Sequence, residues 1–273
     1  MNAVVVHEPH DVRVEEVPEP EMGPKDVVVK VGACGICGTD IHIIDGEFPP
    51  TVYPIIIGHE FGGTVVAVGK DVVGVRVGDR VGVDPTLNCG ECYFCQRGQG
   101  NLCERWNAVG VGHHPGGFAE CVAVPERCVY PIPDGMSFAD AALIEPVSCV
   151  VHGFHLLQPR VGDSYLIYGA GPMGLQNAQM ARFNGASVVA IVDINPSRLE
   201  IARGFGFEVV GASLDEVRHV APRGFDIVIE ATGKTKVAEM AIEAVIRRGK
   251  LLLFGVCPPG EKAAYDAFTI YNQ

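Results

Sequence analysis

The sequence predicts an α/β protein built in two parts, a β-rich first half and a second half in which strands and helices alternate. Short runs of alternating apolar and polar residues between Gly and Pro fill the first half, and this pattern indicates antiparallel strands. In the second half, apolar runs of strand length alternate with segments of helical period, which is typical of βαβ units and a parallel sheet. The length of 273 residues is enough for two domains.

Composition narrows the possible partners. The chain carries 21 basic and 33 acidic residues, a net charge of −12, and 48% of its residues are hydrophobic. This apolar content excludes intrinsic disorder, and the acidic balance gives no attraction to nucleic acid or to an anionic membrane, so we expect a small-molecule partner. The chain has no apolar run long enough for a membrane helix, and its acidic amino terminus does not fit a signal peptide. We therefore expect a cytoplasmic protein.

The first half is expected to form strands at residues 27–31, 63–68 and 80–83, each bounded by turn residues. A helical period begins after Ser137, whose hydroxyl is placed to cap the helix. The change of period predicts one domain over residues 1–147 and a second over residues 148–273.

The second half alternates regularly between the two periods. Strands are expected at 164–168, 187–193, 208–210, 225–233 and 250–256, and helices at 172–185, 196–206 and 236–247, with a short one before residue 225. Five parallel strands with helices between them predict a doubly wound sheet. No low-complexity linker separates the halves, so we expect them to pack together with a cleft between them.

A glycine-rich motif, Gly169-Ala170-Gly171-Pro172-Met173-Gly174, follows the first of these strands and opens the next helix. Gly169 permits the tight turn, Gly171 lets the backbone approach a pyrophosphate, and Gly174 permits close helix packing. The helix amino terminus adds free N–H groups and a positive dipole end, so the motif predicts a dinucleotide site. The alternative is a glycine-rich turn that binds nothing.

Two further residues bear on the choice of dinucleotide. Asp193 ends the next strand, 19 residues after Gly174, and is expected to accept hydrogen bonds from the adenine ribose hydroxyls. A carboxylate there repels a 2′-phosphate, so NAD is favoured over NADP. Arg198 either stacks on or beside the adenine or is a solvated residue of the first helical turn.

Four cysteines, Cys89, Cys92, Cys95 and Cys103, lie close together in a polar, glycine-rich stretch with almost no aliphatic residues. Four thiolates at this density fit a closed tetrahedral zinc site, which has no open position and is therefore structural. The alternatives are reduced thiols packed in a core and an iron–sulfur cluster.

A second constellation starts at Cys34-Gly-Ile-Cys37 and continues through Thr39, Asp40 and His42 to His59-Glu60. One thiolate, one imidazole and one or two carboxylates leave zinc with an open position, which is typical of a catalytic site. The alternative is a redox disulfide between Cys34 and Cys37. Glu145 is a carboxylate inside an apolar run, where it is either paired or metal-bound, or an exposed charge at a helix end.

Together these motifs resemble the zinc-dependent medium-chain dehydrogenases, and the resemblance covers nearly the whole chain. The segments CGICGTDIH, GHEFGGTVVAVG, GGFAE at 116–120, IEPVSCVVHG and GAGPMG and the four-cysteine stretch occur in the family's order. The resemblance implies a catalytic domain with a GroES-like β-barrel core and a Rossmann coenzyme domain.

The family's site residues carry over to matching positions. Cys37 and His59 match ligands of the catalytic zinc, whereas Cys34 matches a position that is not a ligand. Glu60 and Glu145 resemble the carboxylates of the polyol (sorbitol-like) branch, where one binds zinc and the other holds a water molecule or the substrate. Thr39 and a cofactor ribose hydroxyl would pass the alcohol proton towards His42. The alternatives without a catalytic role are a turn hydroxyl for Thr39 and a surface histidine for His42. The resemblance adds Met173, Gly255 and Val256 to the expected coenzyme contacts, which are Gly169, Gly171, Pro172, Gly174, Asp193 and Arg198.

The resemblance implies a zinc- and NAD-dependent oxidoreductase that oxidises a secondary hydroxyl of a polyol to a ketose. The alternatives are a threonine or simple secondary alcohol dehydrogenase and, in another class, a non-catalytic protein that binds NAD and zinc. Family members are homo-oligomers that continue beyond the position of Gln273 with a sixth strand. We therefore expect a truncated chain with an incomplete, five-stranded sheet.

Overall fold

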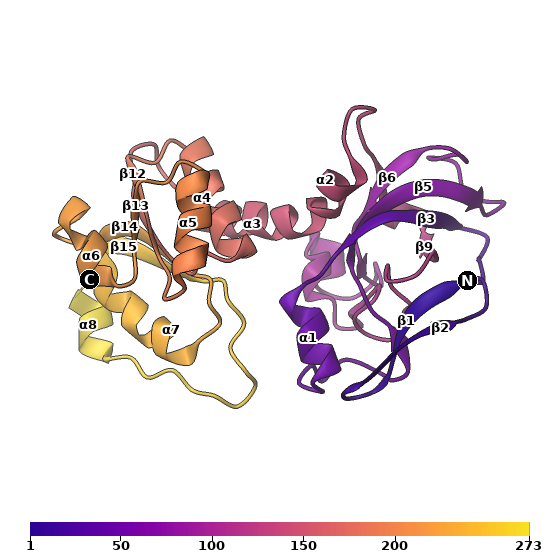
Figure 1. The fold of residues 1–273 in the computed structure, drawn as a ribbon, viewed down its shortest axis with the longest axis horizontal. Helices are drawn as coiled ribbons and strands as arrows, with labels where there is room; N and C mark the ends of the chain where they lie inside the picture. The colour runs from indigo at the N-terminus through magenta and orange to yellow at the C-terminus, as the bar shows by residue number, and fades with distance from the viewer. Residues whose placement is uncertain (273) are drawn as a thin grey trace. The chain divides into compact units, whose positions relative to one another are not determined.

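The computed structural model describes residues 1–272 and divides into two compact units, Met1–Pro146 and a second that starts at Val147 (Figure 1). Each unit has its own hydrophobic core. Within the described residues, no helix combines the length and the apolar character needed to cross a membrane.

The first unit consists mainly of antiparallel strands. Its strands are β1 (Asn2–Glu8), β2 (Asp11–Glu16), β3 (Asp26–Gly35), β4 (Ile55–Ile56), β5 (Glu60–Val68), β6 (Arg80–Val83), β7 (Thr86–Leu87), β8 (Asn107–Ala108), β9 (Cys121–Pro125) and β10 (Val129–Pro131). They form sheets in the orders β10-β6-β5-β3-β9, β2-β1-β4 and β7-β8. The three strands predicted from the alternating pattern fall within β3, β5 and β6. Their buried residues, such as Val27, Val29 and Val65, pack into one core.

Short helices complete this unit and lead out of it. They are α1 (Gly38–Ile44), α2 (Phe138–Ala142) and the 3-10 turns η1 (Cys95–Arg97), η2 (Gly100–Leu102) and η3 (Glu126–Cys128). Ser137 caps α2 as predicted, because its hydroxyl accepts a hydrogen bond from the amide of Asp140 at 3.0 Å. The helix α3 (Ile144–Leu157) begins directly after α2.

The second unit is an α/β layer structure. Its strands are β11 (Ser164–Tyr168), β12 (Val188–Val192), β13 (Val209–Gly211), β14 (Phe225–Glu230) and β15 (Val245–Leu253). Its helices are α4 (Pro172–Phe183), α5 (Pro196–Gly204), α6 (Leu214–Val217), η4 (Arg218–Val220), α7 (Thr235–Ala241), η5 (Ile242–Ala244) and α8 (Ala267–Asn272). All strand pairs of this sheet are parallel, in the order β13-β12-β11-β14-β15, so the predicted five-stranded sheet is confirmed over residues 1–272.

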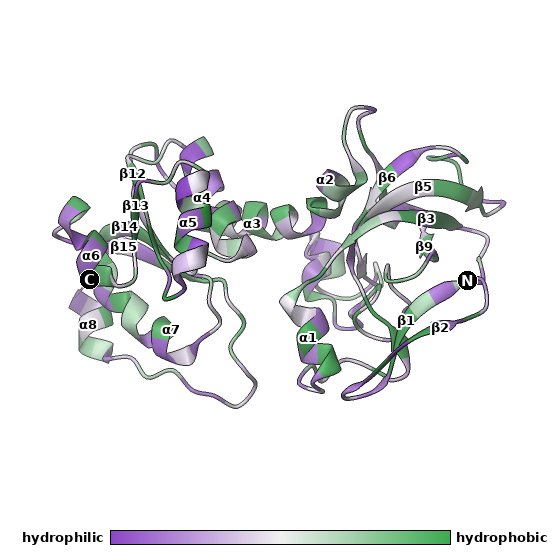
Figure 2. Cartoon of the chain, in the orientation of Figure 1, coloured by the Kyte–Doolittle hydropathy of each residue, from purple (hydrophilic) through white to green (hydrophobic). Residues whose placement is uncertain are grey.

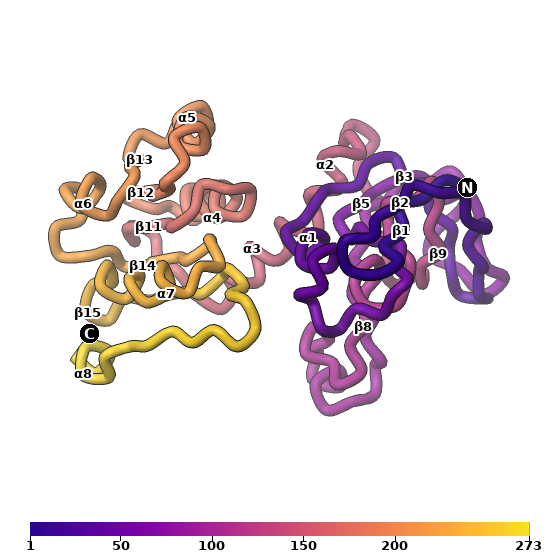
Figure 3. The backbone as a smooth tube through the Cα atoms, turned by 60° about the horizontal axis from the view of Figure 1, so that its bottom comes forward, coloured from indigo at the N-terminus to yellow at the C-terminus, as the bar shows by residue number. Residues whose placement is uncertain are grey.

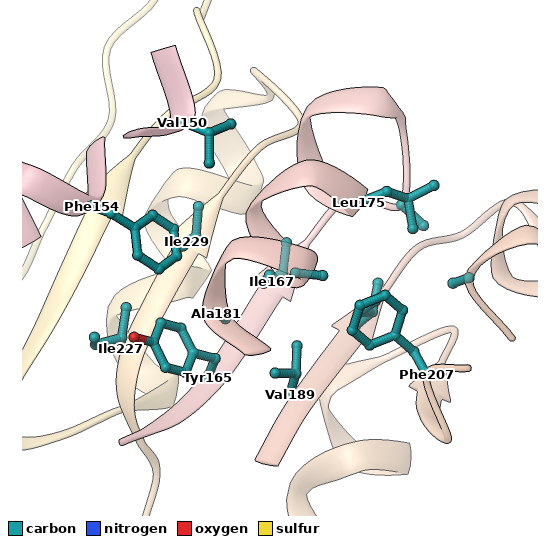
Figure 4. Packing of buried hydrophobic residues seen from close by; sticks show 14 of the residues in the cluster. Val150, Phe154, Tyr165, Ile167, Leu175, Ala181, Val189, Phe207, Ile227 and Ile229 are labelled. Atoms are coloured by element: carbon teal, nitrogen blue, oxygen red, sulfur yellow. The ribbon is translucent and has the colours of Figure 1, made fainter. Parts of the chain in front are cut away.

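Helices cover both faces of this sheet because successive strand residues point to opposite sides. Tyr165 and Ile167 pack with residues of α3, α4 and α5 on one face, as Figure 4 shows for Phe154 and Leu175. Leu166 and the other alternate residues pack with α6 and α7 on the other face. In Figure 2, α4 and α5 carry both hydrophilic and hydrophobic residues, as expected for helices with one buried side. The doubly wound arrangement is therefore confirmed.

The predicted helix at 236–247 is wrong in its last part. The α-helix ends at Ala241, a 3-10 turn follows to Ala244, and Val245 is already paired with Phe225 in the sheet. The β-branched pair Val245 and Ile246 favours extended backbone. The helical period thus continued in the sequence past the point where the strand begins.

Candidate metal and coenzyme sites

Two adjacent strands of the first unit bring a thiol, an imidazole and a carboxylate together. In the antiparallel pair of β3 and β5, Gly35 lies opposite Glu60. Cys37 follows two residues after the end of β3, and His59 directly precedes β5. One ligand atom from each of Cys37, His59 and Glu60 lies within 4.8 Å of the others.

A glycine makes room for this cluster. A Cβ atom at Gly35 would stand 2.3 Å from Oε2 of Glu60, so the Glu60 side chain lies across a position where no side chain could be accommodated. Both His59 and Glu60 are buried, with 6% and 8% of their surface exposed. Two of the three ligands are therefore largely shielded from water, while Cys37 is partly exposed.

Asp40 supports the cluster from the first turn of α1. Its Oδ2 accepts a hydrogen bond from the amide of Cys37 at 2.8 Å, and its Oδ1 faces Nδ1 of His59 at 3.5 Å. Asp40 is 1% exposed, and within residues 1–272 its Oδ1 and the His59 Nδ1 have no hydrogen-bond partner. A carboxylate behind a metal-binding histidine fixes its ring orientation. This role of Asp40 was not predicted from the sequence, although the aspartate follows Cys37 by only three residues.

The charges of the cluster shift its pKa values. Burial disfavours the imidazolium of His59, but the Asp40 carboxylate and the Cys37 thiolate outweigh it and raise the pKa of His59 to about 10. Burial also raises the pKa of Glu60, although Cys37 and His59 partly oppose it. The raised pKa of His59 reflects the negative charge of Asp40 and Cys37 around it, and a metal cation bound at the cluster would also be stabilised by that charge.

The donor set fits zinc. In tetrahedral zinc sites with such ligands, neighbouring ligand atoms are about 3.3–3.8 Å apart, which small side-chain rotations of this cluster can reach. Three protein ligands leave a fourth position for another molecule, as in catalytic zinc sites. Glu145 is partly buried in the first turn of α3 and is not a member of this three-ligand group within the described chain.

Thr39 and His42 lie on one face of α1, because residues three apart in a helix are neighbours. The Thr39 hydroxyl is 3.7 Å from the Cys37 sulfur. His42 is partly exposed, and its Nδ1 pairs with Oε2 of Glu47 at 2.8 Å. The helix therefore leads from the ligand cluster towards an exposed histidine.

The four remaining candidate ligands lie in the segment between β7 and β8, which Figure 3 shows as a projecting loop beside β8. The sulfur atoms of Cys89 and Cys95 are 3.8 Å apart, and those of Cys92 and Cys103 are 3.9 Å apart. Four ligands at about 2.3 Å from a tetrahedral zinc ion stand about 3.8 Å from one another, so the spacing matches a closed zinc site. All ten cysteines are free of disulfides.

Backbone amides prepare these sulfurs for a metal. The amides of Glu91 and Cys92 donate to Sγ of Cys89 at 3.5 and 3.4 Å, and these contacts lower the pKa of Cys89 to about 6. The amide of Arg105 donates to Sγ of Cys103 at 3.3 Å. Residues 88–102 and 104–105 contribute nothing to the core clusters of the described chain, so a metal held by the four sulfurs would cross-link a loop that has no apolar core of its own.

The coenzyme motif lies at the carboxyl ends of the parallel strands of the second unit. Tyr168 at the end of β11 pairs with Val192 on one side and with Glu230 on the other. The chain therefore reverses its strand order at β11, and ligands of such sheets bind at this switch point. The segments after β11, β12, β14 and β15 share that edge.

Each glycine of the motif has its own structural reason. Gly169 has φ +102°, which favours glycine. A Cβ atom at Gly174 would stand 1.8 Å from the carbonyl oxygen of Gly169, so α4 packs directly on the turn. A Cβ atom at Gly171 would meet no atom within 4 Å, which leaves open space beside the amino terminus of α4. This space and the free amides of α4 fit a pyrophosphate.

Asp193 directly follows β12 and is 7% exposed. Its Oδ2 accepts a hydrogen bond from the amide of Ala170 at 2.7 Å, and its Oδ1 accepts one from the amide of Asn195 at 2.8 Å. Nη1 of Arg198 lies 3.7 Å from Oδ2 of Asp193. Arg198 is therefore an ion-pair partner of Asp193 rather than only a solvated helix residue. The hydrogen bond from the Ala170 amide joins Asp193, the predicted ribose contact, to the glycine-rich turn.

The other predicted coenzyme residues lie on the same unit. Pro172 and Met173 form the first turn of α4, and Met173 packs against the buried cluster below it. Gly255 and Val256 follow β15, with the Val256 side chain 77% exposed. The structure thus places all of these residues on the edge that carries the glycine-rich turn.

The fold and these two metal-ligand groups define a class, the zinc-binding dehydrogenases with a nicotinamide coenzyme. Residues 23–134 match the family model of the alcohol dehydrogenase GroES-like domain, and residues 172–273 match that of the zinc-binding dehydrogenases. The chain belongs to the zinc-dependent medium-chain dehydrogenase family and is an oxidoreductase.

Individual relatives agree with this assignment. D-arabinitol dehydrogenase 1 of Uromyces fabae is 37% identical over 282 residues, a match that covers 100% of this chain and 80% of the relative. L-threonine 3-dehydrogenase of Mesorhizobium japonicum is 40% identical over 257 residues, covering 90% and 74%. A zinc-binding dehydrogenase of Sinorhizobium meliloti solved with NADP superposes with a TM-score of 0.94 at 36% identity, covering 99% of this chain and 81% of that one.

Proposed function

We propose that this protein is an NAD-dependent polyol dehydrogenase that oxidises a secondary hydroxyl to a ketone and so forms a ketose. Residues 1–147 form its catalytic domain, and residues 148–273 form its coenzyme domain. The overall reaction moves a hydride from the carbinol carbon to the nicotinamide ring and releases one proton from the hydroxyl.

The observation that carries this proposal is the mixed ligand group of Cys37, His59 and Glu60. Three such ligands bind zinc and leave one position for a substrate hydroxyl, whereas four thiolates do not. A zinc ion bound there would act as a Lewis acid that lowers the pKa of the substrate hydroxyl. Asp40 holds the His59 ring in place from the opposite side.

The remaining catalytic residues are the carboxylate of Glu145 and the two side chains that carry the proton, Thr39 and His42. Glu145 holds a water molecule or the substrate, while Glu60 is the ligand, since Glu60 is the carboxylate that the three-ligand group includes. Thr39 takes the hydroxyl proton and passes it towards His42, and the Glu47 carboxylate orients the imidazole of His42 at 2.8 Å. His42 is partly exposed and can release the proton to water.

Coenzyme selectivity follows from Asp193. Gly169, Gly171 and Gly174 shape the turn that receives the pyrophosphate, and the Asp193 carboxylate meets the adenine ribose. A 2′-phosphate would bring negative charge next to this buried carboxylate, so NAD binds more tightly than NADP. Arg198 lies beside Asp193 and is the group that an NADP complex would use.

Oxidation of threonine is the second candidate function, and it is favoured by the identity to L-threonine 3-dehydrogenase. Both substrates present a secondary hydroxyl, but threonine also carries an ammonium and a carboxylate that a polyol lacks. A substrate panel with NAD separates the two. We expect reduction of NAD with pentitols or hexitols, and turnover of threonine without turnover of polyols would reverse the assignment.

Two further expectations concern the cellular location and the oligomeric state. We expect it in the cytoplasm, because none of its ten cysteines forms a disulfide, as in a reducing compartment. We expect a homo-oligomer for the family's complete proteins, and sedimentation at several protein concentrations measures whether this chain associates.

A further inference from the structure

One fully buried carboxylate in the second unit belongs neither to the metal-ligand groups nor to the predicted coenzyme contacts. Glu230 is the last residue of β14, and its side chain is 0% exposed. Within residues 1–272 no basic side chain forms an ion pair with it. Burial of an unpaired carboxylate is costly, so its bonds to neutral groups must maintain a specific local structure.

All of these bonds go to the loop that follows β14. Oε1 of Glu230 accepts hydrogen bonds from the amide of Thr232 at 2.7 Å and from the amide of Gly233 at 3.1 Å. The hydroxyl of Thr232 donates to the same oxygen, and the amide of Lys234 donates to that hydroxyl at 3.1 Å. The amide of Ala231 donates to the carbonyl of Tyr168 at 2.9 Å. The amides of residues 231–234 therefore all have hydrogen-bond partners within the protein.

The same residue joins this loop to the segment after β15. The carbonyl oxygen of Glu230 accepts hydrogen bonds from the amides of Phe254 and Gly255, both at 2.8 Å. A Cβ atom at Gly255 would stand 2.2 Å from the amide nitrogen of Gly233 and 2.8 Å from Oε2 of Glu230. The two segments are thus packed on each other with no space for a side chain.

The loop also contacts the glycine-rich turn. A Cβ atom at Gly169 would stand 3.1 Å from both the carbonyl oxygen of Ala231 and Cγ2 of Thr232. Gly169 and Gly255 are both predicted coenzyme contacts. Glu230 therefore lies behind three segments that meet at the carboxyl edge of the sheet. Its carboxylate bonds to the loop of residues 231–233, and its backbone carbonyl bonds to the segment after β15.

We propose that Glu230 is a positioning residue of the coenzyme site, which holds the loop of residues 231–233 against Gly169 and Gly255 before the coenzyme binds. This inference rests on the proposed function, since it concerns the same nicotinamide coenzyme. A loop already fixed in its bound conformation loses less entropy on binding, so removal of its anchor weakens coenzyme binding. The bonds of Glu230 reach no coenzyme atom directly, because they end on backbone amides and on Thr232.

The test is calorimetric titration of zinc-loaded Glu230→Met and Glu230→Gln with NAD and NADH. Met has a similar length but accepts none of the three bonds, whereas Gln keeps one accepting oxygen and loses the charge. We expect the Kd for NADH to rise roughly tenfold or more in Glu230→Met and less in Glu230→Gln. Glu208→Gln is the control, because Glu208 is exposed and precedes β13, at the opposite edge of the sheet. The Kd of this variant for NADH should equal that of the wild type.

A second readout separates positioning from general stability. In the coenzyme-free protein, we expect amide hydrogen exchange at Thr232 and Gly233 to accelerate at least tenfold in Glu230→Gln, while Ile227 and Val228 in β14 stay protected. A lower Tm with an unchanged Kd for NADH and unchanged exchange would show that Glu230 only stabilises the fold, and would overturn the proposal.

If Glu230→Met does not fold, two milder variants at Thr232 test the same proposal. Thr232→Val removes one of the three bonds to Glu230 and the acceptor of the Lys234 amide at nearly constant volume, and Thr232→Ser keeps both. We expect weaker NADH binding only in Thr232→Val, and equal affinities in the two variants would contradict the proposal. If wild-type protein bound neither NAD nor NADP, the proposed function would fail instead, so the two failures are distinguishable.

Discussion

Two glycines of the coenzyme turn should respond differently to the same substitution, alanine. Gly174 packs on the turn, so a Cβ atom there would stand 1.8 Å from the carbonyl oxygen of Gly169. Ordinary contact requires 3.4 Å or more, so α4 would have to retreat by about 1.6 Å. Such overpacking costs roughly 1–3 kcal/mol, which lowers Tm by roughly 5–10 °C in a unit of this size.

Gly171 is the contrasting position. Its backbone, with φ −74° and ψ −178°, is accessible to alanine, and the added Cβ atom would meet nothing within 4 Å. The Tm should therefore change by only a few degrees, since the weaker helix capping of Ala and its smaller chain entropy in the unfolded state nearly cancel. The methyl group would occupy the space left for the pyrophosphate, so the Kd for NADH should rise at least tenfold.

The assay combines thermal unfolding without coenzyme and calorimetric titration with NADH. We expect Gly174→Ala to lose both stability and affinity, and Gly171→Ala to lose affinity alone. If Gly171→Ala bound NADH as tightly as the wild type, the pyrophosphate would not lie at the amino terminus of α4. That result would refute the placement of the coenzyme.

Three further predictions concern the other sites. Asp40→Asn should weaken zinc binding at the Cys37 cluster roughly 10–100-fold, measured by competition with a chelator; unchanged release would rule out a supporting role for Asp40. Cys92→Ser should remove the zinc ion of the four-cysteine loop and make residues between β7 and β8 sensitive to protease, and equal resistance would show that the loop does not need metal. Asp193→Ser should lower kcat/KM with NAD roughly tenfold and raise it with NADP, whereas an unchanged ratio would place the selectivity elsewhere.

Much of the fold could be predicted because local signals and global structure agree. The cap at Ser137, the strand-length apolar runs and the glycine-rich turn each depend on neighbours in the sequence, and the structure contains all of them. The prediction that a helix reaches residue 247 was wrong because a long-range contact decides the structure there. Pairing of Val245 with Phe225 is a long-range contact that the helical period could not reveal.

In the candidate site, too, features with a local signal in the sequence were predicted, and features that depend on the folded chain were not. Ligand chemistry and spacing predicted the four-cysteine group, whereas the resemblance to the family was needed to choose Cys37 over Cys34 as the ligand beside His59. In each group the structure brings the ligand atoms together. Spacing alone could not show whether Glu60 or Glu145 is the ligand, because the two lie far apart in the sequence and only the folded chain groups Glu60 with Cys37 and His59. Glu230 gave no signal at all, because its role depends on three loops that meet only in the folded sheet.

The role of the Cys37 cluster is tested most directly by the zinc content per chain, measured together with NAD-dependent polyol oxidation in the wild type and in Cys37→Ser. We expect two zinc ions in the wild type, one for each ligand group. We expect one ion in Cys37→Ser, with turnover lost and NADH binding retained. A single zinc ion in the fully active wild type, or full turnover by Cys37→Ser, would contradict the claim that this cluster holds the catalytic metal.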